Sequence, residues 1–257
     1  MSLPSNVHVS RHPCLLGKLS LLRSKSTSTR EVKALVNDIA TIVGVEAFAS
    51  ALTPVDGPKD ETPIGFEYTT TTIEPQSLSL VPILRSGLGM VEGTLMNPPY
   101  LQASQRNMYL TIANPYPPTP TAIQTLLPNP VPVHHLGLYR EPSTLEPVEY
   151  YNNLPQHVAP DSSHPAAAAS LAIILDPVIA TGGTCAAAIQ TLREWGVKRI
   201  LVLSVIAASE GIKRAAAEWP DAVEIWVAGV DTELTGNGML KPGVGDVGDR
   251  LFLTIGK

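Results

Sequence analysis

Two kinds of apolar pattern recur along the chain. Between residues 32 and 43 apolar side chains return at helical intervals, and Ser28 and Glu31 before them have the spacing of a capping box. This pattern predicts a helix. Short, nearly continuous apolar runs are typical of strands that are buried on both faces. Such runs cover residues 78–84, 131–138, 171–175, 200–207 and 223–230, with Pro132 interrupting the second. The alternation of strands and helices predicts an α/β fold.

The clearest unit lies in the second half of the chain. An apolar strand at 171–175 leads through a loop at 176–183 into a helix at 184–195, which Gly196 ends. A second apolar strand follows at 200–207. This is a βαβ unit, so its two strands should be parallel and joined by a right-handed crossover.

The segments between these elements are predicted to be irregular. Loops are expected at 53–65 and 139–155, and a spacer at 160–170. Nine prolines between residues 97 and 132 are too many for a regular helix or a central strand, which indicates a surface insertion. The expected organisation is a single domain, residues 1–257, made of an N-terminal arm and helix at about 1–50, the insertion at about 100–130 and a tail at about 231–257.

Composition and charge narrow the function. The chain has 257 residues, 44% of them hydrophobic, as in an ordinary globular protein, and its net charge of −5 gives no basic surface for nucleic acid. Cys14 and Cys185 are far apart and form no CxxC pair, so a reducing compartment is expected, with the cytoplasm as the default. We expect Cys185 to be a small buried side chain. No leader-like segment or apolar run of about 20 residues is evident, and no membrane is expected.

The loop of the βαβ unit favours a bound phosphate. Thr181, Gly182, Gly183 and Thr184 lie where the strand turns into the helix, so backbone N–H groups and the helix dipole would face an anion. Asp176, at the end of the strand, is placed to accept hydrogen bonds from ribose hydroxyls. The alternative is a simple Gly-Gly turn with a threonine N-cap. Neither the GxxxxGK[ST] nor the GxGxxG pattern is present, which disfavours ATP and NAD.

LDPVIATGGT, which contains this loop, resembles the motif that binds phosphoribosyl pyrophosphate (PRPP) in phosphoribosyltransferases, and its Asp-Pro pair is similar to the uracil phosphoribosyltransferase branch. VPILRSGLGMVEG, LGLYREPSTLEPVEYYNNLP and KPGVGDVGDRLF resemble further blocks of that family in the same order, and HPCLLGKLSLLRSKSTST resembles its opening segment. The resemblance implies a mostly parallel sheet flanked by helices, with an N-terminal helical arm and a C-terminal hood. It also implies conversion of uracil and PRPP to UMP and pyrophosphate in pyrimidine salvage, with Mg²⁺.

The resemblance also assigns residues. The PRPP-binding residues it implies are Arg85, Arg140, Asp176, Pro177, Val178, Ile179, Ala180, Thr181, Gly182, Gly183, Thr184 and Asp246. The uracil-binding residues it implies are Leu240, Gly245, Asp246 and Val247. Positional and electrostatic catalytic roles fall to Asp176, Arg85 and Asp246. Mg²⁺ is expected to arrive with PRPP, and its protein ligands stay unassigned.

Read from the residues alone, these positions have plainer alternatives. Arg85 lies in a tight loop with two glycines, where a guanidinium could grip a pyrophosphate or simply be a surface side chain in a turn. Arg140 could pair with Glu141 or Glu146 instead of PRPP. The glycine-rich tail could be a simple C-terminal turn, or a segment that brings backbone donors and acceptors against a planar base.

Three positions depart from the family pattern: Ser86, Val247 and Leu253, the last of which is often glycine. The family also implies a homo-oligomer, a dimer or tetramer, and a possible GTP effector. Three rival functions are a PRPP or UMP sensor without turnover, a phosphoribosyltransferase for another base, and an RNA-binding regulator. The acidic balance of the chain disfavours the last.

Overall fold

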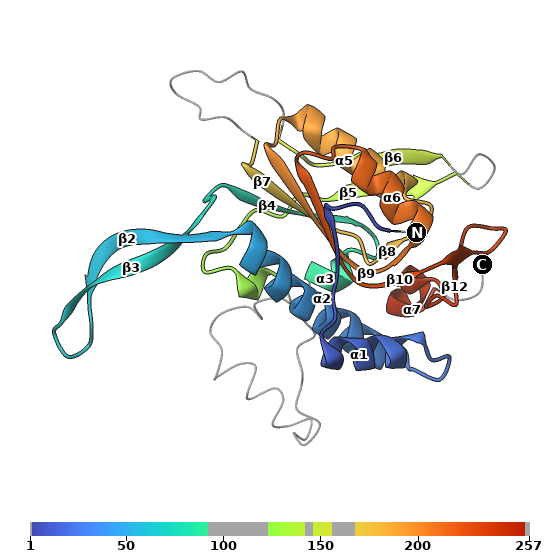
Figure 1. Cartoon of the computed structure of the whole chain (residues 1–257), viewed down its shortest axis with the longest axis horizontal. Coiled ribbons are helices and arrows are strands. Elements are labelled where there is room, and N and C mark those ends of the chain that lie inside the picture. The colour runs from blue at the N-terminus through green and yellow to red at the C-terminus, as the bar shows by residue number, and fades with distance from the viewer. Residues whose placement is uncertain (1, 92–122, 142–145, 156–167, 255–257) are drawn as a thin grey trace.

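An eight-stranded sheet forms the centre of the protein (Figure 1). The computed structural model describes residues 2–91, 123–141, 146–155 and 168–254. Along the sheet the strands follow the order β1 (Val7–Val9), β10 (Val223–Asp231), β9 (Arg199–Ala208), β7 (Leu171–Leu175), β4 (Leu78–Leu84), β5 (Leu136–Arg140) and β6 (Pro147–Asn152), and the short β8 (Val178–Ile179) pairs with β9. All pairings are parallel except that of β5 with β6. The predicted α/β class and the parallel βαβ unit are confirmed.

Helices cover both faces of the sheet, which explains the continuous apolar strands. On one face lie α1 (Pro13–Arg23), α2 (Thr29–Ala51), α3 (Leu88–Val91), the short helix η1 (Gln124–Leu126) and α7 (Val247–Phe252), and on the other lie α5 (Gly183–Trp195) and α6 (Ser209–Ala217). Strand β7 shows the division: Ile173 packs toward the first group and Ile174 toward the second. Because neighbouring side chains of a strand point to opposite faces, both sets must be apolar.

The predicted ends of two helices are confirmed. Ser28 is the N-cap of α2, where its side chain accepts a hydrogen bond from the Glu31 N–H while the Glu31 carboxylate accepts one from the Ser28 N–H. Helix α5 ends at Gly196, whose φ of 95° is a left-handed conformation that glycine adopts without steric cost.

Helix α2 bears on the expectation that the chain has no apolar run of about 20 residues. Among the described residues it alone, with 23 residues and a mean hydropathy of 1.4, is long and apolar enough to cross a bilayer. Its apolar stripe, however, is buried against α1, α3, α7 and strands β9 and β10. We therefore describe it as a core helix, since such helices meet the same criteria of length and hydropathy.

Two predicted loops contain strands. Residues 53–65 include β2 (Thr53–Glu61), which forms an antiparallel hairpin with β3 (Glu67–Glu74) that extends away from the body of the protein (Figure 1). Residues 139–155 include β6. In both cases most side chains are exposed, so the alternation of apolar and polar residues that marks a half-buried strand is missing.

The strand predicted at 131–138 is partly confirmed. Val133 forms an isolated parallel bridge with Leu80 of β4, and the backbone N–H of His134 donates to the Leu80 carbonyl, but the regular strand β5 begins only at Leu136. Most of the proline-rich insertion, and most of the predicted spacer at 160–170, lie outside the described residues.

Candidate active site

The predicted site residues gather at one edge of the sheet. Arg85 follows β4, Arg140 ends β5 and Asp176 follows β7. Because these strands are parallel, their carboxyl ends lie at the same edge, the usual place for a ligand in an open α/β sheet. The side chain of Arg140 lies outside what the structure describes, so only its backbone is placed there.

The predicted phosphate loop is tied to the sheet by its backbone. The Pro177 carbonyl accepts hydrogen bonds from the N–H groups of Val205 and Ile206 at 3.1 and 3.0 Å, and β8 pairs with the end of β9. Gly182, with φ 78°, is the N-cap of α5, so the first N–H groups of that helix follow it directly. The loop encloses a small cavity of about 80 Å³ lined by Asp176, Val178, Ile179, Ala180, Thr181, Gly182, Thr184 and Cys185.

Close packing also requires glycine at position 182. The packing partner is Gly211, which sequence reasoning missed. A Cβ atom on Gly182 would collide with the carbonyl of Gly211 in the first turn of α6, and a Cβ on Gly211 would collide with the carbonyl of Ala180. The two glycines therefore let α6 pack directly on the phosphate loop. The signal was present as a glycine just after strand β9, but helix α6 itself was not predicted.

Asp176 is a buried carboxyl group at the base of this loop. Its side chain and backbone together are 6% exposed, and burial raises its pKa to about 7, against a hydrogen bond from the Val178 N–H that lowers the pKa. A carboxyl group with so little solvent gains from partners that donate hydrogen bonds to it. Vicinal hydroxyls of a ribose are such donors.

Cys185 has the plain structural role that the sequence predicts. It is 1% exposed, and burial, followed by the charge of Asp176, raises the pKa of its thiol well above the usual value. The thiol therefore stays neutral and is no nucleophile. Cys14 is exposed and both cysteines are free.

The Arg85 loop joins the phosphate loop to the tail. Gly87 packs against the Leu175 carbonyl, the last residue of β7, and Gly89 packs against the side chain of Leu251 in α7. Arg85 itself is exposed. The two glycines of this tight loop are thus contact points that bring three segments of the site together.

The tail forms the predicted hood from β11 (Glu233–Leu234), β12 (Leu240–Lys241) and α7. The side chains of Leu240 and Val247 are buried in the core, which leaves their backbone groups as what these positions can offer a base. Gly245 is exposed with φ 73°. Asp246 is exposed and is the N-cap of α7, where its Oδ1 accepts a hydrogen bond from the Asp249 N–H at 2.9 Å.

A partly buried ion pair, which sequence reasoning missed, anchors the hood to α1. The guanidinium of Arg23 donates to both carboxylate oxygens of Asp231, at 2.6 and 3.1 Å, and to the Gly243 carbonyl at 2.9 Å. The Asp231 carboxylate also accepts a hydrogen bond from the Gly243 N–H at 2.8 Å. Arg250 adds contacts from the other side, since it donates to the carbonyls of Leu22 and Val244. No local pattern could have indicated these contacts.

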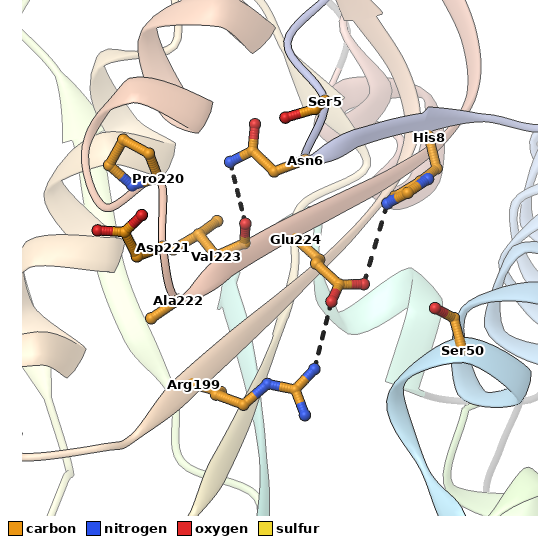
Figure 2. Close-up of a pocket in the computed structure, with 10 residues that line it drawn as sticks. All are labelled: Ser5, Asn6, His8, Ser50, Arg199, Pro220, Asp221, Ala222, Val223 and Glu224. Carbon is orange, nitrogen blue, oxygen red and sulfur yellow. Dashed lines mark hydrogen bonds and ion pairs between the residues drawn. The ribbon is translucent and has the colours of Figure 1, made fainter.

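A larger pocket, of about 320 Å³, lies at the opposite, amino edge of the strands (Figure 2). Glu224 lies between Arg199, at 3.3 Å, and His8, at 3.9 Å, and His8 stacks on Trp226. The pocket contains none of the predicted site residues. Size alone therefore does not identify the candidate site, which the smaller carboxyl-edge cavity and its surroundings fit better.

No preassembled metal site occurs in the described part of the chain, where no group of three or more His, Cys, Asp or Glu side chains could hold an ion. The residues present fit a metal only if a ligand supplies most of the coordinating oxygens. Mg²⁺ commonly binds in this way, through substrate phosphates and one or two carboxylates.

Comparison with known proteins adds to this geometry. The family model for uracil phosphoribosyltransferase matches residues 9–105 and 118–254. A uracil phosphoribosyltransferase of Finegoldia magna is 40% identical over 97% of this chain and 99% of its own length, and one of Exiguobacterium sibiricum is 37% identical over the same shares. Among solved structures, the AQ2163 protein of Aquifex aeolicus is similar with a TM-score of 0.73 and 26% identity, over 96% of this chain and 98% of that one.

Proposed function

The chain belongs to the uracil phosphoribosyltransferase family, and we propose that it joins uracil to the ribose 5-phosphate of PRPP at the carboxyl edge of the sheet, giving UMP and pyrophosphate. The observation that carries the proposal is the buried Asp176 beside the cavity of the phosphate loop. The backbone of the phosphate loop suits an anion and the Asp176 carboxyl group suits hydroxyl groups. A ribose 5-phosphate carries both a phosphate and hydroxyls.

The reaction replaces pyrophosphate at the anomeric carbon with N1 of uracil. Positive charge develops on the sugar while negative charge leaves, so the protein contributes position and electrostatic stabilisation. In this proposal the 181–184 backbone holds the 5-phosphate and Asp176 orients the ribose. Arg85 and Arg140 bind the pyrophosphate.

The hood selects the base in the same proposal. Leu240, Gly245 and Val247 offer backbone donors and acceptors that can pair with the two carbonyls and the N–H of uracil. Asp246, as the N-cap of α7, fixes the start of that helix beside the base and serves the PRPP site. The anchoring of the hood by Arg23 keeps these backbone groups in place.

The test is UMP formation from uracil and PRPP, beside cytosine, hypoxanthine and orotate as bases. We expect turnover with uracil alone. Turnover with another base would keep the PRPP site and overturn the assignment of the hood. A folded protein that binds PRPP and turns over no base would be a sensor.

We also propose Mg²⁺ as the cofactor that accompanies PRPP. When bound it neutralises pyrophosphate charge, and Asp176 is a buried acidic residue that lines the cavity of the loop. Titration of PRPP binding with and without Mg²⁺ tests this, and equal affinity in both conditions would contradict it.

A homo-oligomer, a dimer or tetramer, is proposed from the β2–β3 hairpin. Its two strands pair only with each other in the described sheet topology, and Ile64, Phe66 and Tyr68 near its tip are 81%, 67% and 45% exposed. An isolated two-stranded hairpin is marginally stable in water. Packing of this hairpin on a second copy would bury its apolar side chains.

Light scattering after size exclusion tests this proposal with Phe66→Ser, which should weaken the oligomer. Leu21→Ser, at another exposed apolar position, is the control and should leave the mass unchanged. A monomeric wild-type protein would overturn the proposal.

From the family resemblance we further propose a GTP effector, a role in pyrimidine salvage in the cytoplasm, and a single domain over 1–257. Rates at subsaturating PRPP with and without GTP test the first. Thermal unfolding followed by two probes tests the last, since a single domain should lose all its structure in one transition.

A further inference from the structure

Arg214 of α6 reaches over the phosphate loop. A Cβ atom built on Gly183 would lie 3.3, 3.6 and 3.7 Å from Nη1, Cζ and Nη2 of Arg214. All three distances concern the guanidinium group, so the charged end of the side chain, and not its stem, lies on the loop. Gly183 is the first residue of α5, within the backbone segment that we assign to the 5-phosphate.

The position of Arg214 is fixed by the packing of α6. Gly211, in the first turn, contacts Gly182 and Ala180 directly, and Ile212 and Ala215 are fully buried under the helix. Because helical side chains lean toward the N-terminus of their helix, a residue one turn after Gly211 leans back toward the loop. A Cβ on Gly183 would be in close contact with the guanidinium, so glycine at this position lets the group approach the backbone of the loop.

The charge of Arg214 is available to a ligand. Arg214 is exposed, and within the described residues its guanidinium has no hydrogen bond or ion pair, although Glu210 lies one turn before it. The loop from Asp176 to Thr184 contains no cationic side chain of its own. A phosphate there would rely on backbone N–H groups and on the helix dipole, which is worth about half a charge.

We propose that Arg214 is a further phosphate-binding residue, whose guanidinium contacts the 5-phosphate shared by PRPP and UMP. A guanidinium suits this task because it can donate two parallel hydrogen bonds to phosphate oxygens. This inference rests on the proposed function, since it concerns the same site. It adds a specific cation to the backbone cradle and gives α6 a role in substrate binding.

Two products of the reaction separate this role from a structural one. UMP carries the 5-phosphate, whereas pyrophosphate binds in the part of the site assigned to Arg85. Arg214→Gln should weaken UMP binding about tenfold, the effect of losing about 1.4 kcal/mol, and should raise the KM for PRPP similarly. The Kd of pyrophosphate and the KM for uracil should change less than about twofold. Arg214→Lys should restore part of the UMP affinity.

Lys213→Gln is the matched control, because it removes the same charge from the neighbouring position of α6. It should leave UMP binding unchanged. Equal weakening by both variants would indicate a general electrostatic effect, and UMP binding by Arg214→Gln at the wild-type Kd would overturn the proposal. If the wild-type protein bound neither UMP nor PRPP, the proposed function would fail together with this inference; normal turnover by Arg214→Gln with unchanged KM values would remove this inference alone.

Discussion

The phosphate loop and the hood serve the same site but are built differently. The loop consists of consecutive residues between a strand and a helix, and its geometry is set by neighbours in the sequence and by Gly211. The hood is held by Arg23 and by the carbonyls at the end of α1, more than 200 positions away along the chain. One half of the site is therefore a local motif, and the other half depends on the whole fold being complete.

Removal of the hood anchor should have the largest effect. In Arg23→Ala the Asp231 carboxylate, whose side chain is 4% exposed, loses its charged partner. Leaving a buried charge unpaired costs about 3–5 kcal/mol of unfolding free energy, and the KM for uracil should rise more than that for PRPP. Urea unfolding and steady-state kinetics measure both.

Arg199→Ala is the control, since it removes an arginine from a half-exposed ion pair at the opposite edge of the sheet. This variant should lower the free energy of unfolding by at most about 1 kcal/mol and leave the KM values for uracil and PRPP unchanged. An equal loss of stability in the two variants would contradict the importance of the anchor.

A substitution in the phosphate loop should affect PRPP binding rather than uracil binding. Gly182→Ala places a Cβ at φ 78° against the Gly211 carbonyl, so the loop or α6 must move. We expect the free energy of unfolding to fall by about 2–4 kcal/mol, and the KM for PRPP rather than that for uracil to rise. Gly17→Ala, in helix α1 with open space around the new Cβ, should instead be neutral or stabilising. Similar kinetics for Gly182→Ala and the wild type would refute the role of the loop.

Asp176→Asn should separate stability from function. Because burial raises the folded-state pKa of Asp176 from 3.8 to about 7, the unfolded chain binds fewer protons than the folded one between these values. The destabilisation is therefore absent below about pH 4, grows as the pH rises and is complete above about pH 7. At pH 8 the variant should gain about 1–3 kcal/mol of stability and should gain less at pH 5, while PRPP binding falls.

The exposed Asp221→Asn serves as the comparison for this charge removal and should show neither effect. Thermal unfolding at the two pH values, with PRPP titration, gives the result. A loss of stability in Asp176→Asn at pH 8 would show that its carboxylate is stabilising in the free protein.

The smallest effect is expected at the end of the hood. Leu253 follows α7 with φ 56°, a left-handed conformation that is costly for a leucine, and the residue is 72% exposed. Leu253→Gly should therefore raise the free energy of unfolding by about 0.5–1 kcal/mol, measured by thermal unfolding. Leu21→Gly, at an exposed position inside α1, should instead lower the free energy of unfolding. A destabilised Leu253→Gly variant would show that the side chain makes contacts that outweigh the strain.

The sequence predicts the loop better than the hood for a physical reason. A buried strand, an acidic residue at its end and a Gly-Gly turn are all local signals, and they place Asp176 correctly after β7 and the 181–184 segment at the start of α5. Family resemblance supplied the hood residues, but not the partners that hold them. An ion pair between Arg23 and Asp231 leaves no trace in local periodicity.

The remaining differences also follow from what local patterns can report. The β2–β3 hairpin is exposed on both sides, so its strands lack the alternation that burial imposes; the β2 segment was predicted as loop and β3 was not predicted. Helix α6 was missed because only four of its nine residues are buried, with small side chains among them. Of the predicted site residues, Arg85, Arg140 and Asp176 are brought to one edge by the parallel sheet, whose strands the apolar runs indicate.

The anchor between Arg23 and Asp231 also sets an order of events during synthesis. The two residues are 208 positions apart, so at about 5–20 residues per second Arg23 leaves the ribosome about 10–40 s before its partner. Only in the last part of that interval, after residue 208 and before Asp231 has emerged, can the phosphate loop fold against β9 while α1 still has no hood to hold. In a nascent chain the phosphate-binding loop should therefore form before the hood that selects the base.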